Sequence, residues 1–311
     1  MNLDPRKSEH SLASYSPVKH NQSQALGYVV KICGEVKFMN HPLIRYHGGK
    51  FRLSNWIISH FPSHETYVEP FGGGASVLLQ KAPSRMEVYN DLDSDVVNFF
   101  EVLRDQQLSI ELAKQVELTP YSRVEFLNAR SDTNNKVERA RRLVIRAQMG
   151  FGSAGVTRRN TGFRLDTARS GSDIVTIWQR QPDLIMQAAA RLKKVLIENR
   201  DAVKVIQDHD RKDTLFFVDP PYVLDTRNIG GKAYRHEMTN VDHEQLVSVL
   251  KACKGKIILC GYEHPIYEAL DWKKVKKPVA ASGQSGSVLR EEVLWINPQA
   301  ENQHDLFSEV L

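Results

Sequence analysis

The sequence predicts an α/β fold, a doubly wound parallel sheet that is interrupted by a mainly helical insert. Three observations support this prediction. Short apolar segments that end in an acid alternate with amphipathic segments over residues 66–104, which is the pattern of successive β-α units. Helical periodicity then continues over 105–191 without a convincing strand. Strand-like segments return at 195–199, 214–219 and 254–262.

The first strands and helices are predicted ahead of the insert. RYHGGK (45–50) indicates a tight turn that leads into a helix around 52–60. TYVEPF (66–71) predicts a short buried strand, and GGGASVLLQK then predicts a glycine turn followed by a helix. RMEVYND (85–91) predicts a second strand, and the apolar spacing of SDVVNFFEVLRD (94–105) predicts an amphipathic helix.

The insert is predicted to be helical on both sides of an irregular loop. VERARRLVIRAQM predicts a helix, residues 151–172 a Gly/Arg/Thr-rich loop, and 173–195 a helix broken near Pro182. After the returning strands, HEQLVSVLKAC predicts a helix, and EEVLWIN (291–297) predicts an antiparallel strand at the far edge of the sheet. We therefore predict a flexible N-terminal tail (1–40), a sheet domain (41–104 and 192–298), the helical insert (105–191) and a C-terminal tail (299–311).

Composition and charge predict a globular protein with a local basic field. Apolar residues make up 41% and charged residues 25% of the chain, which are ordinary values. No apolar run approaches the roughly 18 residues of a membrane span, and no signal pattern opens the chain, so we expect a cytoplasmic protein. Residues 120–170 hold eleven Lys or Arg against four acids, although the whole chain carries only +5. This indicates either a polyanionic partner or a solvated helix face.

The cysteines predict neither a disulfide framework nor a metal site. Cys33, Cys253 and Cys260 form no CxxC pair and no Cys/His cluster, which are the usual signs of such sites. We expect a chain that binds no metal and that is a monomer by default.

Features at the ends of the first two predicted strands indicate an adenosine-containing ligand. Three glycines (72–74) allow a ligand to approach the backbone closely, although a tight structural turn would explain them as well. Glu69 can accept a hydrogen bond from a ligand amine or a ribose hydroxyl. Asp91 follows the glycines by about 20 residues, where an acid receives the two ribose hydroxyls of an adenosine-type cofactor. The glycines lack the full GxGxxG spacing, so a dinucleotide is not favoured.

The segment DPPY (Asp219–Tyr222) ends another predicted strand with two prolines, which forbid further ladder pairing. Ligands of doubly wound sheets bind beyond the carboxyl ends of the strands, so Asp219 is predicted to share an edge with the glycine turn. Asp219 and the carbonyl of Pro220 form a paired acceptor, and Tyr222 offers a stacking face. This combination suits a planar ring that carries an exocyclic amino group.

Taken in order, RYHGGK, YVEPFGGGASVLL, NDLDSDVVNFF and FFVDPPY resemble the Dam-like, D12-class DNA adenine-N6 methyltransferases. HEMTNVDHEQL, IILCGY and EEVLWIN are also similar to later segments of that family, so the resemblance spans roughly 43–298. It implies a Rossmann-like S-adenosylmethionine-dependent methyltransferase sheet, S-adenosylmethionine as cofactor and double-stranded DNA as partner. The chain departs from the family at Tyr46, which is often tryptophan, and at Ala75, which is often glycine.

The resemblance also implies roles for individual residues. The cofactor-binding set, with Glu69 added from its strand-end position, is Tyr46, Lys50, Glu69, Phe71, Gly73, Asp91 and Asp219. The catalytic set, which would hold the flipped adenine and direct methyl transfer to N6, is Asp219, Pro220, Pro221 and Tyr222. We expect segment 224–240 to order over the base as a lid. His236 within it fits a packing role as well as a role in the reaction.

The basic insert supplies the candidate DNA contacts. Arg139, Arg142 and Arg146 are three and four residues apart, so they share one helix face and are predicted to contact phosphates. The loop is the candidate for base reading, through Arg158, Arg159, Asn160 and Arg164. A surface loop without base contacts is the alternative.

Other substrates and a non-enzymatic role stay open at this point. The N4 amine of cytosine and adenine in RNA are chemically similar targets. Asp219 favours adenine, because cytosine-specific members more often have serine before the prolines. A DNA-binding regulator without turnover is the remaining alternative, although the acid, both prolines and the tyrosine are all present.

Overall fold

The computed structural model describes residues 39–157, 161–165, 173–226, 233–283 and 286–301. All of these residues belong to one compact unit, which spans 36–311. The predicted N-terminal tail lies almost wholly outside the described residues. The same is true of residues 302–311 of the predicted C-terminal tail.

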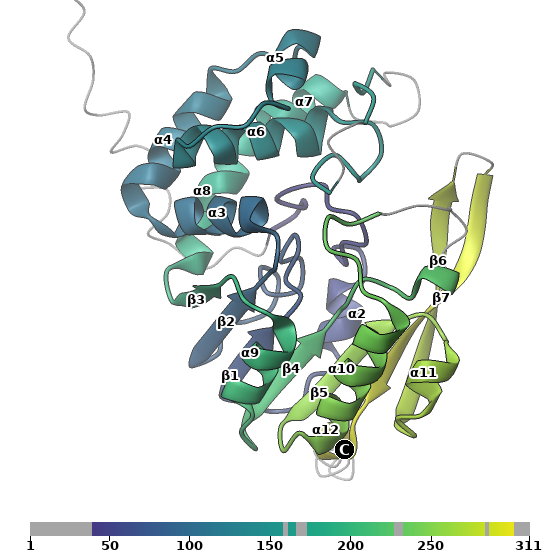
Figure 1. The fold of residues 1–311 in the computed structure, drawn as a ribbon. Helices are drawn as coiled ribbons and strands as arrows, with labels where there is room; N and C mark the ends of the chain where they lie inside the picture. The colour runs from purple at the N-terminus through teal and green to yellow at the C-terminus, as the bar shows by residue number, and fades with distance from the viewer. Residues whose placement is uncertain (1–38, 158–160, 166–172, 227–232, 284–285, 302–311) are drawn as a thin grey trace, which may run out of the picture. The chain divides into compact units, whose positions relative to one another are not determined.

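A seven-stranded sheet of order β3-β2-β1-β4-β5-β7-β6 forms the centre of the described chain (Figure 1). The strands are β1 (Thr66–Glu69), β2 (Met86–Asn90), β3 (Val195–Glu198), β4 (Thr214–Val218), β5 (Lys256–Gly261), β6 (Lys273–Gly283) and β7 (Gly286–Ile296). The first five run parallel, and β7 is antiparallel to both β5 and β6. This confirms the predicted α/β class and its largely parallel, Rossmann-like sheet.

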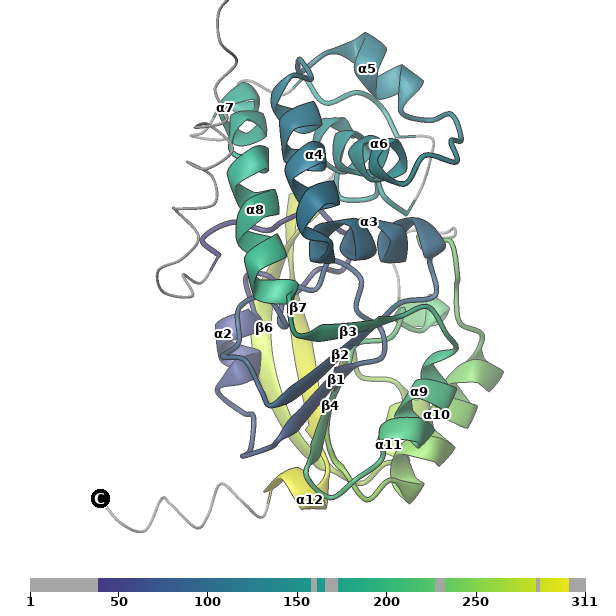
Figure 2. The ribbon, with the colours of Figure 1, turned by 90° about the vertical axis from the view of Figure 1, so that its left-hand side faces the viewer.

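Helices cover the sheet on both faces, as the sequence predicts for parallel strands. The helices of the sheet region are α2 (Ser54–Ile58), α3 (Ser94–Arg104), α9 (Ala202–His209), α10 (Asn240–Ala252), α11 (Pro265–Glu268) and α12 (Pro298–Glu301). Figure 2 shows α9 and α10 on one side of the strands and α2 on the other. The core between α9, α10 and the sheet includes Val205, Ile206, Leu246, Phe216 and Trp295, each fully buried.

Two predicted elements of the sheet region differ from the structure. The glycine turn leads into consecutive turns over 74–80 rather than a regular helix. Ala75 has φ +51°, a left-handed value that interrupts a right-handed helix. The second difference concerns the edge of the sheet. β7 is antiparallel as predicted, but β6 lies outside it, and the lysines and proline of β6 are typical of an edge strand.

The insert is mainly helical, as predicted. It contains α4 (Gln106–Glu117), α5 (Arg123–Asn128), α6 (Lys136–Met149), α7 (Ile174–Gln179) and α8 (Gln181–Leu192). The predicted break near Pro182 is confirmed, because Pro182 stands in the first turn of α8, where its missing N–H costs no hydrogen bond. α6 packs against α3, and α8 packs against α4. Within the insert, only an isolated bridge between Gly150 and Phe163 has β character among the described residues.

No helix among the described residues is long and apolar enough to cross a membrane.

Candidate active site

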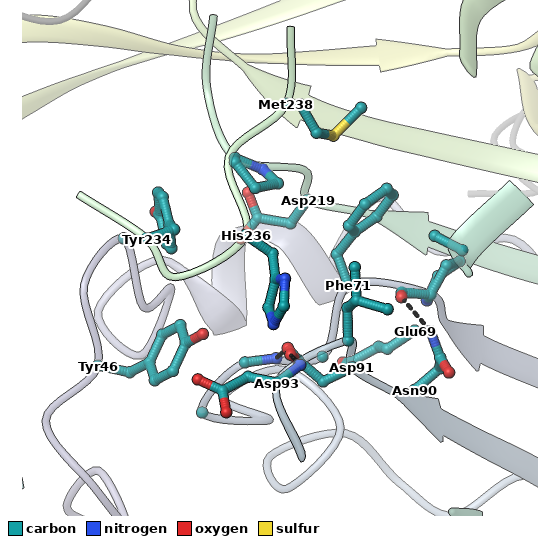
Figure 3. A pocket seen from close by; sticks show the side chains of 18 of the residues that line it. Tyr46, Glu69, Phe71, Asn90, Asp91, Asp93, Asp219, Tyr234, His236 and Met238 are labelled. Atoms are coloured by element: carbon teal, nitrogen blue, oxygen red, sulfur yellow. Dashed lines mark hydrogen bonds between the residues drawn. The ribbon is translucent and has the colours of Figure 1, made fainter. Parts of the chain in front are cut away.

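The carboxyl ends of β1, β2 and β4 open into one cavity of about 270 Å³, which is where doubly wound sheets bind their ligands. Three acids from these strand ends line it: Glu69, Asp91 and Asp219. The cavity also includes Tyr46, Lys50, Phe71, Gly73 and Pro221 from the predicted set. Figure 3 shows Tyr46, Phe71, Asp91 and Asp219 around the same space. The structure therefore brings together segments that are far apart in the sequence.

The glycine turn is packed against two tyrosine rings. A Cβ atom on Gly72 would stand 2.1 Å from Cε2 of Tyr89, and one on Gly73 would stand 2.7 Å from Cε1 of Tyr46. Gly73 also has φ +48°. The Tyr89 hydroxyl donates to the Gly73 carbonyl at 2.7 Å. These contacts require glycine for a structural reason, and the same glycines line the cavity.

We expect Gly72→Ala to lower the free energy of unfolding by roughly 1–3 kcal/mol, which is typical of overpacking. The added methyl has to displace the fully buried Tyr89 ring. Urea unfolding of the purified variant measures the change. Gly162→Ala is a matched control, because its Cβ would meet only the Phe151 Cβ at 3.9 Å. Equal stability of Gly72→Ala and the parent protein would contradict the packing described above.

Asp91 ties the second strand to the glycine turn. Its Oδ2 accepts from the Gly73 amide at 2.8 Å, and its Oδ1 accepts from the Asp93 amide at 2.7 Å. Burial raises the pKa of Asp91 to about 6, although these two amides act in the opposite direction. Each carboxylate oxygen has a second lone pair for a ligand. Asp91 can therefore hold the loop and receive hydroxyl groups from the cavity at the same time.

Glu69 is buried more completely than the sequence suggests, at 2% exposed. Its Oε1 accepts from the Tyr67 hydroxyl and from the Leu78 amide, both at 2.7 Å. Burial raises the pKa of Glu69 to about 8. Glu69 lines the cavity, but both of these hydrogen bonds are to the protein, so it stabilises the turns that follow the glycines.

Asp219 forms a buried ion pair with Lys50. The Lys50 Nζ lies 2.8 Å from Oδ1 and 2.9 Å from Oδ2 of Asp219. Burial raises the pKa of Asp219 to about 6, and Lys50 opposes that rise. Burial lowers the pKa of Lys50, but Asp219 and its other acidic neighbours outweigh this effect and raise it well above its usual value. At neutral pH the pair consists of an ammonium and a carboxylate.

The other residues of DPPY surround this ion pair. Pro221 lines the cavity and Pro220 is buried. The Tyr222 ring centroid lies 4.8 Å from Lys50 Nζ and 4.5 Å from the centroid of Tyr262. Tyr222 is not among the residues that line the cavity, but its ring stands beside the same ammonium that holds Asp219.

Residues 233–238, which we call the strap, cross the cavity after DPPY. Arg235 donates to Asp93 and to Asp95, each at 2.8 Å. The Tyr234 hydroxyl donates to the His47 carbonyl at 3.3 Å. His236 and Met238 line the cavity, and Figure 3 shows the His236 ring directed toward Asp91. His236 stands out in the sequence without a defined role, whereas no sequence pattern indicates Arg235 or Met238. Residues 227–232 of the predicted lid lie outside the described residues.

The three arginines predicted to contact phosphates have partners inside the chain. Arg139 donates to Asp95 at 2.6 Å, and Arg142 donates to Glu138 at 2.7 Å. Arg146 is 5% exposed and donates to the Ala129 carbonyl at 2.8 Å. Arg146 therefore differs from the prediction, because a buried guanidinium stabilises the insert and is not open to a phosphate. Arg139 and Arg142 stay partly exposed.

Of the predicted base-reading residues, Arg158, Arg159 and Asn160 lie outside the described residues. Arg164 is described and half-buried, and its backbone amide donates to the Met149 carbonyl at 2.8 Å. The Tyr121 hydroxyl donates to the Arg164 carbonyl at 2.9 Å. Arg164 therefore lies next to the carboxyl end of α6.

The family of this chain follows from its match to a family model. Residues 46–277 match the model of the D12 class N6 adenine-specific DNA methyltransferases. The chain belongs to this family. The match covers RYHGGK from its tyrosine, the glycine turn, Asp91, the whole insert and DPPY, so it confirms the resemblance. Family membership implies S-adenosylmethionine as methyl donor.

Individual relatives share parts of the sequence. A DNA N-6-adenine-methyltransferase of Escherichia phage P1 is 24% identical over 67% of this chain and 28% of its own length. The modification methylase StsI of Streptococcus sanguinis is 30% identical over 28% of this chain and 13% of its own length. The DNA adenine methylase of Escherichia coli (strain K12) is 34% identical over 21% of this chain and 23% of its own length. The matches thus span less than a third of each relative.

The donor set of the cavity fits S-adenosylmethionine. Asp91 offers carboxylate lone pairs for a ribose, and the glycine turn lines the cavity next to it. Phe71 and Met238 give the cavity apolar surface. Among the residues that the structure describes, no group of His, Cys, Asp and Glu could hold a metal ion.

Proposed function

We propose that this protein transfers a methyl group from S-adenosylmethionine to N6 of an adenine that is flipped out of duplex DNA. The observation that carries this proposal is the shared cavity of Asp91 and Asp219. One acid is placed for a ribose and the other for an exocyclic amine, so a cofactor and a target base would meet between them.

When bound, S-adenosylmethionine supplies an electrophilic methyl group on a sulfonium. Asp91 holds the ribose hydroxyls, while Tyr46, Phe71 and Gly73 shape the surrounding wall. Asp219 and the carbonyl of Pro220 accept hydrogen bonds from the two N–H groups of adenine N6. Positive charge grows on that nitrogen as the methyl group arrives, and prearranged acceptors stabilise it. Alignment of the reacting atoms supplies much of the remaining acceleration.

A base inside a duplex cannot reach this cavity, so the target has to leave the stack. Tyr222 then stacks on the extruded ring, a contact worth about 1–3 kcal/mol. The strap covers the base and the cofactor together. We keep the expectation of a monomer that acts in the cytoplasm without a metal ion.

The insert binds the DNA backbone and reads its sequence in this proposal. Arg139 and Arg142 are partly exposed on α6 and contact phosphates. Arg158, Arg159, Asn160 and Arg164 read base edges, because arginine and asparagine make bidentate contacts with guanine and adenine.

Methyl uptake tests the proposal directly. The purified protein is incubated with labelled S-adenosylmethionine and with duplex DNA, single-stranded DNA or RNA of the same sequence. Label in duplex DNA above both other substrates supports the proposal. Preferential label in RNA would support the alternative that adenine in RNA is the substrate. Absence of label in all three nucleic acids would favour a DNA-binding regulator.

We expect neutralising Arg158 and Arg159 to weaken duplex binding and to flatten its salt dependence. Each phosphate contact contributes about −0.9 to the slope of log K against log salt concentration. Fluorescence anisotropy of a labelled duplex at several salt concentrations measures that slope in the double glutamine variant. Lys193→Gln and Lys194→Gln, which lie at the end of α8, serve as a charge-matched control. An unchanged slope in the Arg158/Arg159 variant would exclude both residues from the interface.

A further inference from the structure

A second buried acid lies beside the ion pair of Lys50 and Asp219. Glu292 is 4% exposed, and Lys50 Nζ lies 3.5 Å from its Oε1. The same oxygen accepts from the Tyr222 hydroxyl and lies 3.4 Å from the Cys260 sulfur. Glu292 is not among the residues that line the cavity, and none of the roles proposed above includes it.

The position of Glu292 in β7 explains this placement. Val293 and Trp295 of β7 belong to the core under α9 and α10. Side chains alternate along a strand, so Glu292 points to the opposite face. α2 lies on that side of the sheet (Figure 2), and Cys260 of the neighbouring β5 reaches Glu292 there. Lys277 of β6 is its cross-strand neighbour.

One buried ammonium is thus shared by the carboxylates of Asp219 and Glu292. A buried charge without a partner is costly, and Asp219 alone would neutralise Lys50. With one ammonium and two carboxylates, the cluster of Lys50, Asp219 and Glu292 has a formal net charge of −1. This surplus matters for the proposed transfer, because positive charge develops on the amine that Asp219 holds. Without Glu292, the Lys50 ammonium, which lies 2.8 Å from Asp219 Oδ1, would oppose that charge.

We propose that Glu292 is a positioning residue for methyl transfer, which offsets the charge of Lys50 and fixes the Tyr222 ring through its hydroxyl. This inference rests on the proposed function and deepens it. It assigns a role to a residue outside the DPPY segment and outside the cavity.

Single-turnover methyl transfer to duplex DNA tests the inference through Glu292→Gln. The amide keeps an acceptor for Tyr222 but removes the charge. We expect the transfer rate to fall at least about 10-fold, while the dissociation constant for S-adenosylmethionine stays within about threefold. Glu291→Gln is the matched control. The Glu291 side chain is 59% exposed, so this variant should keep the parental rate. Glu292→Asp, which perturbs packing but keeps the charge, should be faster than Glu292→Gln. A parental rate in Glu292→Gln, or equal rates in the two Glu292 variants, would overturn the inference.

A second measurement does not depend on activity. Lys50→Met leaves Asp219 and Glu292 as two buried carboxylates without their shared ammonium. Adding Glu292→Gln to Lys50→Met should therefore raise the urea midpoint of unfolding, although Glu292→Gln alone lowers it. If Glu292→Gln lowers the urea midpoint equally in the parent protein and in Lys50→Met, Lys50 is not shared by the two carboxylates. If the parent protein methylates no nucleic acid, the proposed function fails, and this cycle still decides whether Glu292 and Lys50 are coupled.

Discussion

Asp219→Ala is expected to reduce the rate of methyl transfer by on the order of 10²–10³ or more, the usual cost of losing one prearranged polar group at a reacting centre. The variant loses the carboxylate that faces the cavity and that Lys50 holds at 2.8 Å. Duplex binding should persist, because the DNA contacts that we propose lie in the insert. Single-turnover transfer and duplex anisotropy on the same preparation measure both properties.

Asp219→Asn is the matched control for this prediction. It keeps one carbonyl acceptor and nearly the same volume, so its rate should lie between those of Asp219→Ala and the parent. Lys50 still has Glu292 within 3.5 Å in both variants, which limits the loss of stability. Parental turnover by Asp219→Ala would remove DPPY from the chemistry.

Asp91→Ala is expected to weaken S-adenosylmethionine binding by at least about 100-fold. Hydrogen bonds to a charged group contribute about 1.5–3 kcal/mol each, and a ribose offers two hydroxyls. The variant also frees the Gly73 amide, which Asp91 holds at 2.8 Å, so the turn loses support as well. Isothermal titration calorimetry of the protein without DNA measures the dissociation constant.

The raised pKa of Asp91 adds a pH dependence with a defined sign. The ionised carboxylate accepts hydroxyl hydrogen bonds at both oxygens, and the protonated form does so less well. Because burial raises the pKa of Asp91 to about 6, affinity should be full at pH 7.5 and should fall as the pH drops through 6. Asp91→Asn cannot titrate, so its weaker affinity should stay nearly constant over that range. The same pH dependence in Asp91→Asn and the parent would assign the effect to another group.

The acids at the strand ends could be predicted from local sequence. Glu69, Asp91 and Asp219 each follow an apolar strand in a β-α pattern, and parallel strands bring such residues to one edge. The glycine turn was equally visible, because three successive glycines rarely serve a helix or a strand interior. These features needed no knowledge of strand order beyond the doubly wound class.

Other parts of the site depend on tertiary contacts that no local pattern encodes. Glu292 reaches Lys50 across a long sequence separation, through the pairing of β7 with β5. Glutamate is rarely fully buried, so the local sequence EEVLWIN did not mark Glu292 as a buried residue. Arg146 looked like a surface arginine by its spacing, yet it points into the insert toward Ala129. Helical periodicity defines a shared face but does not say whether that face meets solvent or another helix.

The identity of the methylated base tests the central claim most directly. Unmethylated duplex DNA is incubated with the protein and with S-adenosylmethionine that carries a deuterated methyl group, digested to nucleosides and analysed by mass spectrometry. The geometry around Asp219 predicts deuterated N6-methyladenine that disappears with Asp219→Ala. Deuterated N4-methylcytosine in its place, or N6-methyladenine formed equally well by Asp219→Ala, would contradict it.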